Sequence, residues 1–271
     1  MNYPNIIEAV QRDGYAVMEN VIGQNDLNAM QAAFDRQIEH YEAHFDSSKI
    51  NENELGTLRC IISLDEAFLP LAAVQPVMEV AQELLGDYLY YSFNGFYTSR
   101  RFTHPTTLFH RDVPLFTPEV MLSLNLLYCL DDTTAENGAT WFVPGSHLLR
   151  NRPSDDYIET HKKQVTMKAG SVLFFNSLTF HASGINHNGG QRRCIANVLR
   201  KSFMKPQFQW DQILGGNGFA NHLSEESKKR FGFYNNPAPS LEAYYQEGIR
   251  RRAEREQRGV KTVYGIELKD I

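Results

Sequence analysis

The sequence predicts a mainly β fold, a sandwich or jelly roll with flanking helices. The main observation is a series of eight short runs, rich in Val, Leu, Phe, Tyr and Thr and separated by turn residues, between residues 88 and 203. Strands at this spacing are typical of sandwiches and jelly rolls, whereas a parallel sheet needs a helix between successive strands. The segments on either side are predicted to be helices and loops.

The N-terminal part has helical apolar spacing. Residues 5–12 and 25–45 are predicted helices, and a short strand-like run, residues 14–22, lies between them. Residues 74–86 are a third predicted helix. These segments precede the β region, so we expect them to pack around it.

The predicted strands follow in chain order: 88–99, 106–112, 119–130, 139–143, 163–168, 171–176, 179–183 and 192–203. Asn137-Gly138, between the third and fourth runs, is a strong hairpin signal because both residues tolerate a positive φ. We therefore expect these two runs to be joined by a hairpin.

No stretch rich in Pro, Gly or Ser divides the chain, so one domain over residues 1–271 is expected. It would have a helical N-terminal part (1–86), a β core (about 87–203), and a lid and C-terminal helix (204–271). Within the last part, residues 204–236 are candidates for a lid over a cavity, and a charged helix is predicted near 240–258.

Composition excludes several classes of function. The net charge of −5 argues against a nucleic-acid backbone binder. The three cysteines, Cys60, Cys129 and Cys194, are far apart and include no CxxC pair, which argues against a disulfide scaffold or structural zinc site. No signal peptide and no run of about 20 apolar residues is visible. We expect a cytoplasmic protein with a small-molecule substrate, and no nucleic-acid or membrane partner; the oligomeric state is not predicted.

The candidate metal ligands are His110, Asp112 and His181. On a strand, residues i and i+2 share a face, so His110 and Asp112 would point at one metal. Taken alone, such a triplet is weak evidence, because a histidine held by a hydrogen bond in the core is a common alternative. His181 ends a second strand beside a turn, where it can face an open mouth. Two imidazoles and one carboxylate on one face of an octahedron are typical of non-haem Fe(II) oxygenases.

A candidate anion-binding arginine follows eleven residues after His181. Arg192 and Arg193 begin an apolar strand, and the guanidinium fork matches a carboxylate such as the far end of 2-oxoglutarate. Adjacent strand residues face opposite ways, so one of the two lies at the surface, and parity within the strand does not choose between them. Ser183 is a candidate second contact, with a turn-stabilising serine as the equal alternative.

In these residues the chain resembles the phytanoyl-CoA dioxygenase family of Fe(II)/2-oxoglutarate-dependent oxygenases. The matching segments, which together span most of the chain, are 13–22, His110-Arg-Asp112, 130–138, 142–147, 169–175 and His181-Ala-Ser-Gly-Ile-Asn186. Arg192 falls at the family's usual distance for the arginine that binds 2-oxoglutarate, which favours it over Arg193. The match at Ser183 likewise favours a role in co-substrate binding.

The resemblance implies a double-stranded β-helix, a cupin-like jelly roll, that holds Fe(II) and uses 2-oxoglutarate and O₂ as co-substrates. It implies release of succinate and CO₂ with oxidation of a C–H bond, by default hydroxylation. The family places co-substrate pocket residues on the strand that includes Ser123, Asn125 and Leu127, so we expect Asn125 to face inward. The identity of the prime substrate is not implied.

Candidate substrate-binding residues are Arg101 and His104, because the loop from Ser99 to Thr107 leads into the HxD pair. Two other functions stay open. A metal-dependent cupin enzyme that needs no 2-oxoglutarate would keep the metal ligands without Arg192. A catalytically silent β-barrel binding module would need none of the four residues.

Overall fold

The computed structural model describes residues 3–44, 54–98, 107–235, 237–257, 262–263 and 266–267. The chain separates into two compact units, residues 1–232 and 233–271. No helix among the described residues has the length and apolar character needed to cross a membrane.

The helices of the described residues are α1 (Tyr3–Asp13), α2 (Gln24–His44), η2 (Ile61–Ser63), η3 (Glu66–Ala72), α3 (Val77–Leu85), η4 (Ser146–Leu148), α4 (Asp155–His161), α5 (Trp210–Gly216), η5 (Phe219–His222), α6 (Glu225–Arg230) and α7 (Leu241–Gln257). The strands are β1 (Tyr15–Met18), β2 (Thr57–Leu58), β3 (Tyr88–Thr98), β4 (Ser123–Cys129), β5 (Trp141–Phe142), β6 (Lys163–Gln164), β7 (Val172–Asn176), β8 (His181–Ala182), β9 (Arg192–Lys201), β10 (Thr262–Val263) and β11 (Ile266–Glu267).

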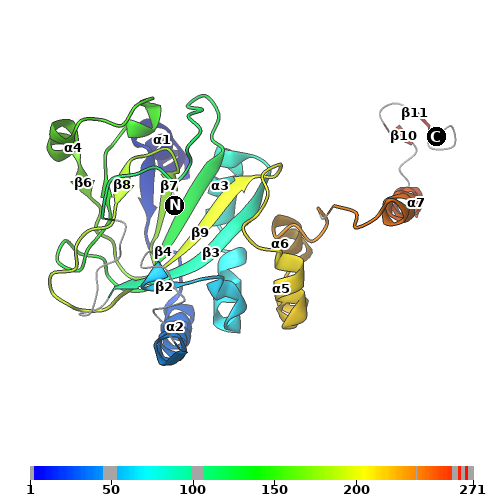
Figure 1. Ribbon diagram of the computed structural model, residues 1–271, viewed down its shortest axis with the longest axis horizontal. Helices are drawn as coiled ribbons and strands as arrows, with labels where there is room; N and C mark the ends of the chain where they lie inside the picture. Colours follow the sequence, from blue (N-terminus) through cyan, green and yellow to red (C-terminus); the bar gives the residue numbers. More distant parts are fainter. Residues whose placement is uncertain are drawn as a thin grey trace. The chain divides into compact units, whose positions relative to one another are not determined.

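The first unit is built on two antiparallel sheets (Figure 1). The large sheet has the order β1-β7-β4-β9-β3-β2, and the small sheet has the order β6-β5-β8. Neighbours in the large sheet are far apart in sequence: β4 lies between β7 and β9. Such crossing connections are typical of jelly rolls, and they bring distant residues into one cavity.

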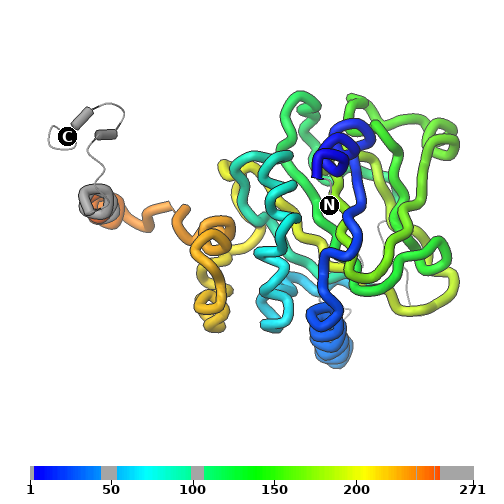
Figure 2. Tube along the Cα trace, turned by 180° about the vertical axis from the view of Figure 1, so that it is seen from behind, coloured from blue at the N-terminus to red at the C-terminus, as the bar shows by residue number. Residues whose placement is uncertain are grey.

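One face of the large sheet is covered by the N-terminal helices. Helix α3 packs on β4 and α1, and the early part of the chain lies over the face that is turned to the viewer in Figure 2. The side chains on this face include Leu124, Leu126 and Tyr128 of β4, all fully buried. Residues on the other face of β4, such as Asn125, line a cavity.

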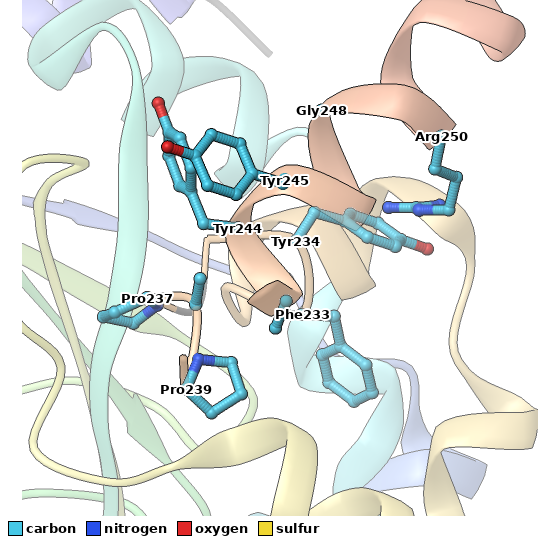
Figure 3. Close-up of a pocket in the computed structure, with 10 residues that line it drawn as sticks. Phe233, Tyr234, Pro237, Pro239, Tyr244, Tyr245, Gly248 and Arg250 are labelled. Carbon is cyan, nitrogen blue, oxygen red and sulfur yellow. The ribbon is translucent and has the colours of Figure 1, made fainter. Parts of the chain in front are cut away.

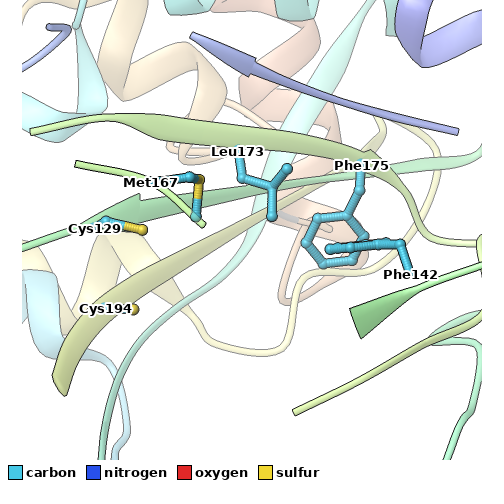
Figure 4. Close-up of a cluster of buried hydrophobic side chains, with 6 residues drawn as sticks. All are labelled: Cys129, Phe142, Met167, Leu173, Phe175 and Cys194. Carbon is cyan, nitrogen blue, oxygen red and sulfur yellow. The ribbon is translucent and has the colours of Figure 1, made fainter. Parts of the chain in front are cut away.

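A cluster of buried side chains joins the two sheets at one end of that cavity (Figure 4). Phe142 of the small sheet packs against Phe175 of β7, with ring centroids 5.2 Å apart. Cys129 and Cys194 contribute from paired positions on β4 and β9. This apolar cluster closes one end of the interior, because close-packed side chains leave no room there for water.

The second unit contains α7 and the short pair β10–β11. A hollow in this unit is lined by residues from Phe233 to Arg250, with the rings of Tyr244 and Tyr245 on the first turns of α7 (Figure 3). Among the described residues, its lining contains no His, Cys, Asp or Glu.

Most predicted elements are confirmed, including the three N-terminal helices, the strand after the first of them, and the charged C-terminal helix. The expected strand 106–112 is wrong: within its described part, 107–112, only His110 forms an isolated bridge. The segment that pairs with His110 turns at residues 177–179, so strand pairing does not continue beyond this bridge. Helix α4 was not predicted, although Ser154 caps it by accepting a hydrogen bond from the Tyr157 backbone N–H.

The hairpin expected at Asn137-Gly138 is also wrong. The strands on either side, β4 and β5, belong to different sheets. Gly138 does have a positive φ of 88°, and Asn137 exchanges hydrogen bonds with Thr134. Asn137 and Gly138 do form a turn, as predicted, but the turn connects the two sheets instead of two paired strands.

Gly95 allows β3 to pack closely against the N-terminal helices. A Cβ at Gly95 would lie 2.5 Å from Ile61 Cδ1 and 2.9 Å from the Phe34 ring. We expect Gly95→Ala to destabilise the protein by about 1–3 kcal/mol through overpacking, measured as a lower urea midpoint. Gly215→Ala is the control, because a Cβ there meets nothing within 4 Å. Equal stability of the two variants would contradict this account of the sheet–helix contact.

Candidate metal centre

His110, Asp112 and His181 converge at one point, and one ligand atom from each lies within 4.8 Å of the others. The Nε2 atoms of His110 and His181 are 3.5 and 3.7 Å from Asp112 Oδ1. Ligands bound to one ion at about 2.1 Å are roughly 3.0–3.4 Å apart. The two distances to Asp112 exceed this range by a few tenths of an ångström, so a small rotation of the side chains would bring all three ligands onto a single metal ion.

The protonation pattern of the two imidazoles also fits a metal. Nδ1 lies 2.9 Å from the Leu108 carbonyl oxygen in His110 and 3.0 Å from the Thr179 carbonyl oxygen in His181. A carbonyl only accepts, so each Nδ1 carries the hydrogen and each Nε2 of the neutral ring presents a lone pair toward Asp112. The two nitrogen lone pairs and the carboxylate oxygen that they face repel one another unless a cation or a proton lies between them. Two imidazoles and a carboxylate are the donor set of a non-haem Fe(II) site.

The local electrostatics keep the carboxylate ionised. Burial is the largest effect and opposes ionisation of Asp112, but the neighbouring His181 and His110 rings and the hydrogen bond from Asn125 together outweigh it and lower the pKa of Asp112. Burial lowers the pKa of His181, which favours the neutral ring that a metal requires. The neighbouring Asp112 carboxylate raises the pKa of the more exposed His110.

Backbone hydrogen bonds bring the ligands together. The His110 and His181 backbones bond to each other in both directions, at 3.0 and 3.1 Å, and the Asp112 N–H donates to the Ser177 carbonyl at 3.0 Å. Arg111, between the two ligands, points the other way. Its guanidinium donates to the carbonyls of Leu178, Ser146, Leu149 and Arg150 and lies 4.3 Å from the Phe180 ring centroid. Arg111 thus ties the HxD segment to the loops beside it.

Asn125 orients the metal carboxylate. Its Nδ2 donates to Asp112 Oδ2 at 2.8 Å and to Ser177 Oγ at 2.7 Å, and Ser177 Oγ donates to Ser123 Oγ at 2.8 Å. The inward direction of Asn125 agrees with the expectation from the sequence. Its hydrogen bonds link it to Asp112, and partners of this kind fix the geometry of a metal ligand.

Aromatic side chains form the wall behind His181. The Phe142 ring is stacked on the imidazole with centroids 5.7 Å apart, and Phe175 lies 4.8 Å away. These rings restrict the imidazole to one orientation and exclude water from its buried side. Together with the apolar cluster of Figure 4, they place the metal centre at the border between a dry core and an open cavity.

The cavity has a volume of about 370 Å³, and all three candidate ligands line it. This size is within the usual range of small-molecule sites, roughly 300–1,000 Å³. Asn125, Ser183 and Arg192 line the same cavity. Arg101 and His104 lie outside the described residues. Of the expected lid segment, Gln207 lines the cavity, whereas Trp210 is buried against Phe93 on the opposite face of β3.

The two adjacent arginines of β9 have different partners. Arg193 binds Asp131 at 2.7 Å and Asp35 at 2.9 Å, so its charge is matched within the protein. Arg192 is 7% exposed and donates to the Gly138 carbonyl, while its Nε is buried without a hydrogen-bond partner. No carboxylate of the described residues lies within 4 Å of the Arg192 guanidinium.

Several site residues were not predicted from the sequence. Arg111, Ser177, Phe142 and Phe175 act through contacts with residues distant in the chain, and no local pattern marks them. Among these four residues, only Arg111 had a sequence feature that indicated its role. It lies between two candidate ligands, so its side chain points to the opposite side of the segment.

Comparison with known proteins agrees with this geometry. The model of the phytanoyl-CoA dioxygenase family matches residues 10–194. An uncharacterized protein of Mycobacterium tuberculosis is 27% identical over 90% of this chain and 92% of its own length. Ectoine dioxygenase of Stutzerimonas stutzeri is 25% identical over 67% of this chain and 71% of its own length.

Among solved structures, HygX from Streptomyces hygroscopicus, with nickel and 2-oxoglutarate bound, superposes with a TM-score of 0.60. The match covers 76% of this chain and 90% of HygX at 14% identity. At this identity the likeness concerns the fold, and it confirms the predicted jelly roll.

We expect Asn125→Ala to weaken Fe(II) binding by about 10- to 100-fold, because Asp112 loses the hydrogen bond that orients it. The measurement is an anaerobic titration with Fe(II), with circular dichroism to check folding. Asn221→Ala, at an exposed position, is the control. Unchanged iron affinity in Asn125→Ala would mean that the hydrogen bond does not support the metal centre.

Proposed function

This chain belongs to the phytanoyl-CoA dioxygenase family, and on that premise we propose that His110, Asp112 and His181 hold its iron. The protein is an Fe(II)- and 2-oxoglutarate-dependent dioxygenase. We propose that Arg192 and Ser183 bind the distal carboxylate of 2-oxoglutarate and that the enzyme hydroxylates a small-molecule metabolite.

One observation carries the assignment. Two imidazole Nε2 atoms and a carboxylate converge in a cavity that is also lined by a buried arginine without an acidic partner among the described residues. A metal that keeps free coordination positions can bind the keto acid end of 2-oxoglutarate there, and Arg192 matches the other end as a bidentate donor.

When bound, the iron supplies the oxidising chemistry: 2-oxoglutarate, O₂ and a substrate C–H bond become succinate, CO₂ and an alcohol. The protein contributes position and a dry environment. Asn125 holds the Asp112 carboxylate, Arg111 holds the segment that carries it, and Phe142 and Phe175 keep His181 in place. Arg192 orients the co-substrate by its distal carboxylate.

The remaining expectations are part of the proposal. Ectoine dioxygenase is a relative that by its name acts on a small molecule, which supports a small-molecule substrate here. A cytoplasmic location is supported by three buried cysteines without disulfides. We propose that residues 1–271 form one oxygenase domain with every proposed ligand in the first unit, residues 1–232.

The two alternatives raised by the sequence are less well supported. A cupin enzyme that needs no 2-oxoglutarate has no use for Arg192 in the metal cavity. A silent binding module has no reason to keep two imidazoles and an ionised carboxylate in mutual contact, since such buried groups are costly without a ligand. The family match also favours the oxygenase.

Anaerobic addition of Fe(II) and 2-oxoglutarate should produce a weak visible charge-transfer band, because both bind at one centre. His181→Ala should abolish the band while the protein stays folded. His187→Ala is the matched control, because His187 is exposed. A full band and normal turnover in His181→Ala would refute the ligand assignment. Succinate release in a metabolite screen then identifies the prime substrate.

Arg192→Ala should raise the apparent KM for 2-oxoglutarate by roughly 30-fold to several thousand-fold, because one partner of a buried ion pair is removed. Arg193→Ala should instead reduce stability, since Arg193 bridges Asp131 and Asp35. The measurement is the dependence of succinate formation on 2-oxoglutarate concentration. A larger KM increase in Arg193→Ala than in Arg192→Ala would reverse the assignment.

A further inference from the structure

Arg200 lines the same cavity as Arg192, and the proposed reaction does not use it. Arg200 lies on β9, eight positions after Arg192. Residues at even positions of this strand, from Arg192 through Ala196 to Arg200, line the same cavity because strand side chains alternate. One strand face therefore carries a guanidinium at each end.

The charge of Arg200 has no acidic partner. No carboxylate of the described residues lies within 4 Å of its guanidinium, and its Nε is buried without a hydrogen-bond partner. Its Cζ lies 3.4 Å from the centroid of the Tyr91 ring. An aromatic ring covers one face of a guanidinium and leaves the N–H groups at its edge available. The Tyr91 ring thus holds Arg200 in place and leaves guanidinium N–H groups free to donate hydrogen bonds to a ligand.

A bulge in β3 places Tyr91 in this position. The pairing of β3 with β9 shifts between Tyr90 and Ser92, so that Tyr91 has no direct partner. Tyr91 and Ser92 both line the cavity as a result. Bulges near active sites commonly redirect a side chain, and here the redirected ring supports Arg200.

The metal centre lies between the two arginines along the strand. Asn125, which donates to Asp112, pairs with Val198. Val198 is two positions from Arg200 and six from Arg192. At about 3.3 Å per residue, Arg200 is roughly 7 Å along the strand from the level of the metal carboxylate. An anionic group at Arg200 would therefore lie on the side of the metal opposite the co-substrate arginine.

The charge balance indicates the chemical class of the ligand. Arg59, which also lines the cavity, is paired with Glu54 at 2.6 Å, and Arg193, on the opposite face of β9, is paired with two aspartates. Arg200 thus contributes one unmatched positive charge, which a single carboxylate neutralises.

We propose that Arg200, stacked on Tyr91, binds a carboxylate of the prime substrate, so that this enzyme oxidises a small polar acid within a few bonds of its carboxylate. The inference rests on the proposed function, because it assigns Arg192 to 2-oxoglutarate and leaves Arg200 for the second ligand. Arg200 is then the residue that determines specificity for acids over their neutral analogues.

The test uses the full chain loaded with Mn(II) and N-oxalylglycine, an inert analogue of 2-oxoglutarate that fills the Arg192 site. Hydroxy and amino acids of three to six carbons, each paired with its primary amide, are titrated by calorimetry. We expect the unaltered protein to bind at least one acid more tightly than its amide. Arg200→Met should weaken binding of that acid on the order of 10- to 100-fold and leave the amide unchanged. Arg200→Lys should retain part of the preference.

Arg230→Met is the matched control. Arg230 also stacks on a tyrosine, with its Cζ 3.8 Å from the Tyr88 ring centroid, but it is paired with Glu226 and does not line this cavity. It should not change the preference for acids. The inference is overturned if no acid binds more tightly than its amide, or if Arg200→Met keeps the full preference.

A second measurement separates this inference from the proposed function. The Fe(II)–2-oxoglutarate charge-transfer band of Arg200→Met should form at the 2-oxoglutarate concentrations that the unaltered protein requires. Loss of 2-oxoglutarate affinity in Arg200→Met equal to that in Arg192→Ala would assign Arg200 to the co-substrate and overturn the inference. Failure of the unaltered protein to form the band would instead refute the proposed function.

Discussion

The proposed metal centre depends on one short antiparallel contact between residues 110–112 and 177–181. The reciprocal backbone hydrogen bonds of His110 and His181, and that of Asp112 with Ser177, bring three ligands together from segments about 70 residues apart. A shift of this pairing by one residue would turn Arg111 toward the cavity and both ligands away from it, because neighbouring side chains alternate. The hydrogen bonds of Arg111 to four carbonyls oppose such a shift.

The same alternation distributes the positive charges of β9. Arg193 points to the face where Asp131 and Asp35 neutralise it, so it contributes to the structure. Arg192 and Arg200 point into the cavity, where no acid of the described residues pairs with them. A buried guanidinium without a counterion, such as that of Arg192, is unfavourable for folding, and residues that violate packing rules in this way tend to mark binding sites.

The cavity therefore combines opposite environments over a short distance. Phe142, Phe175 and the two buried cysteines are apolar, whereas Arg192 and Arg200, on the cavity-facing side of β9, are charged. The apolar cluster and the helices on the far face of the sheet supply stability through burial. That stability offsets the free-energy cost of polar groups in the cavity that have no hydrogen-bond partner.

The sequence by itself determined the type of chemistry and the long elements. The HxD pair, the turn residues after His181 and the periodicity of segments such as 88–99 are local signals, readable within a few residues, and the family resemblance linked them to Arg192. The tertiary structure decided the contacts between distant segments. Parity within the strand did not choose between Arg192 and Arg193; the family resemblance favoured Arg192, and the order of the strands shows that its face meets the cavity. The hydrogen bond from Asn125 to Asp112 and the bulge that brings Tyr91 to Arg200 likewise depend on register between strands, which no single segment encodes.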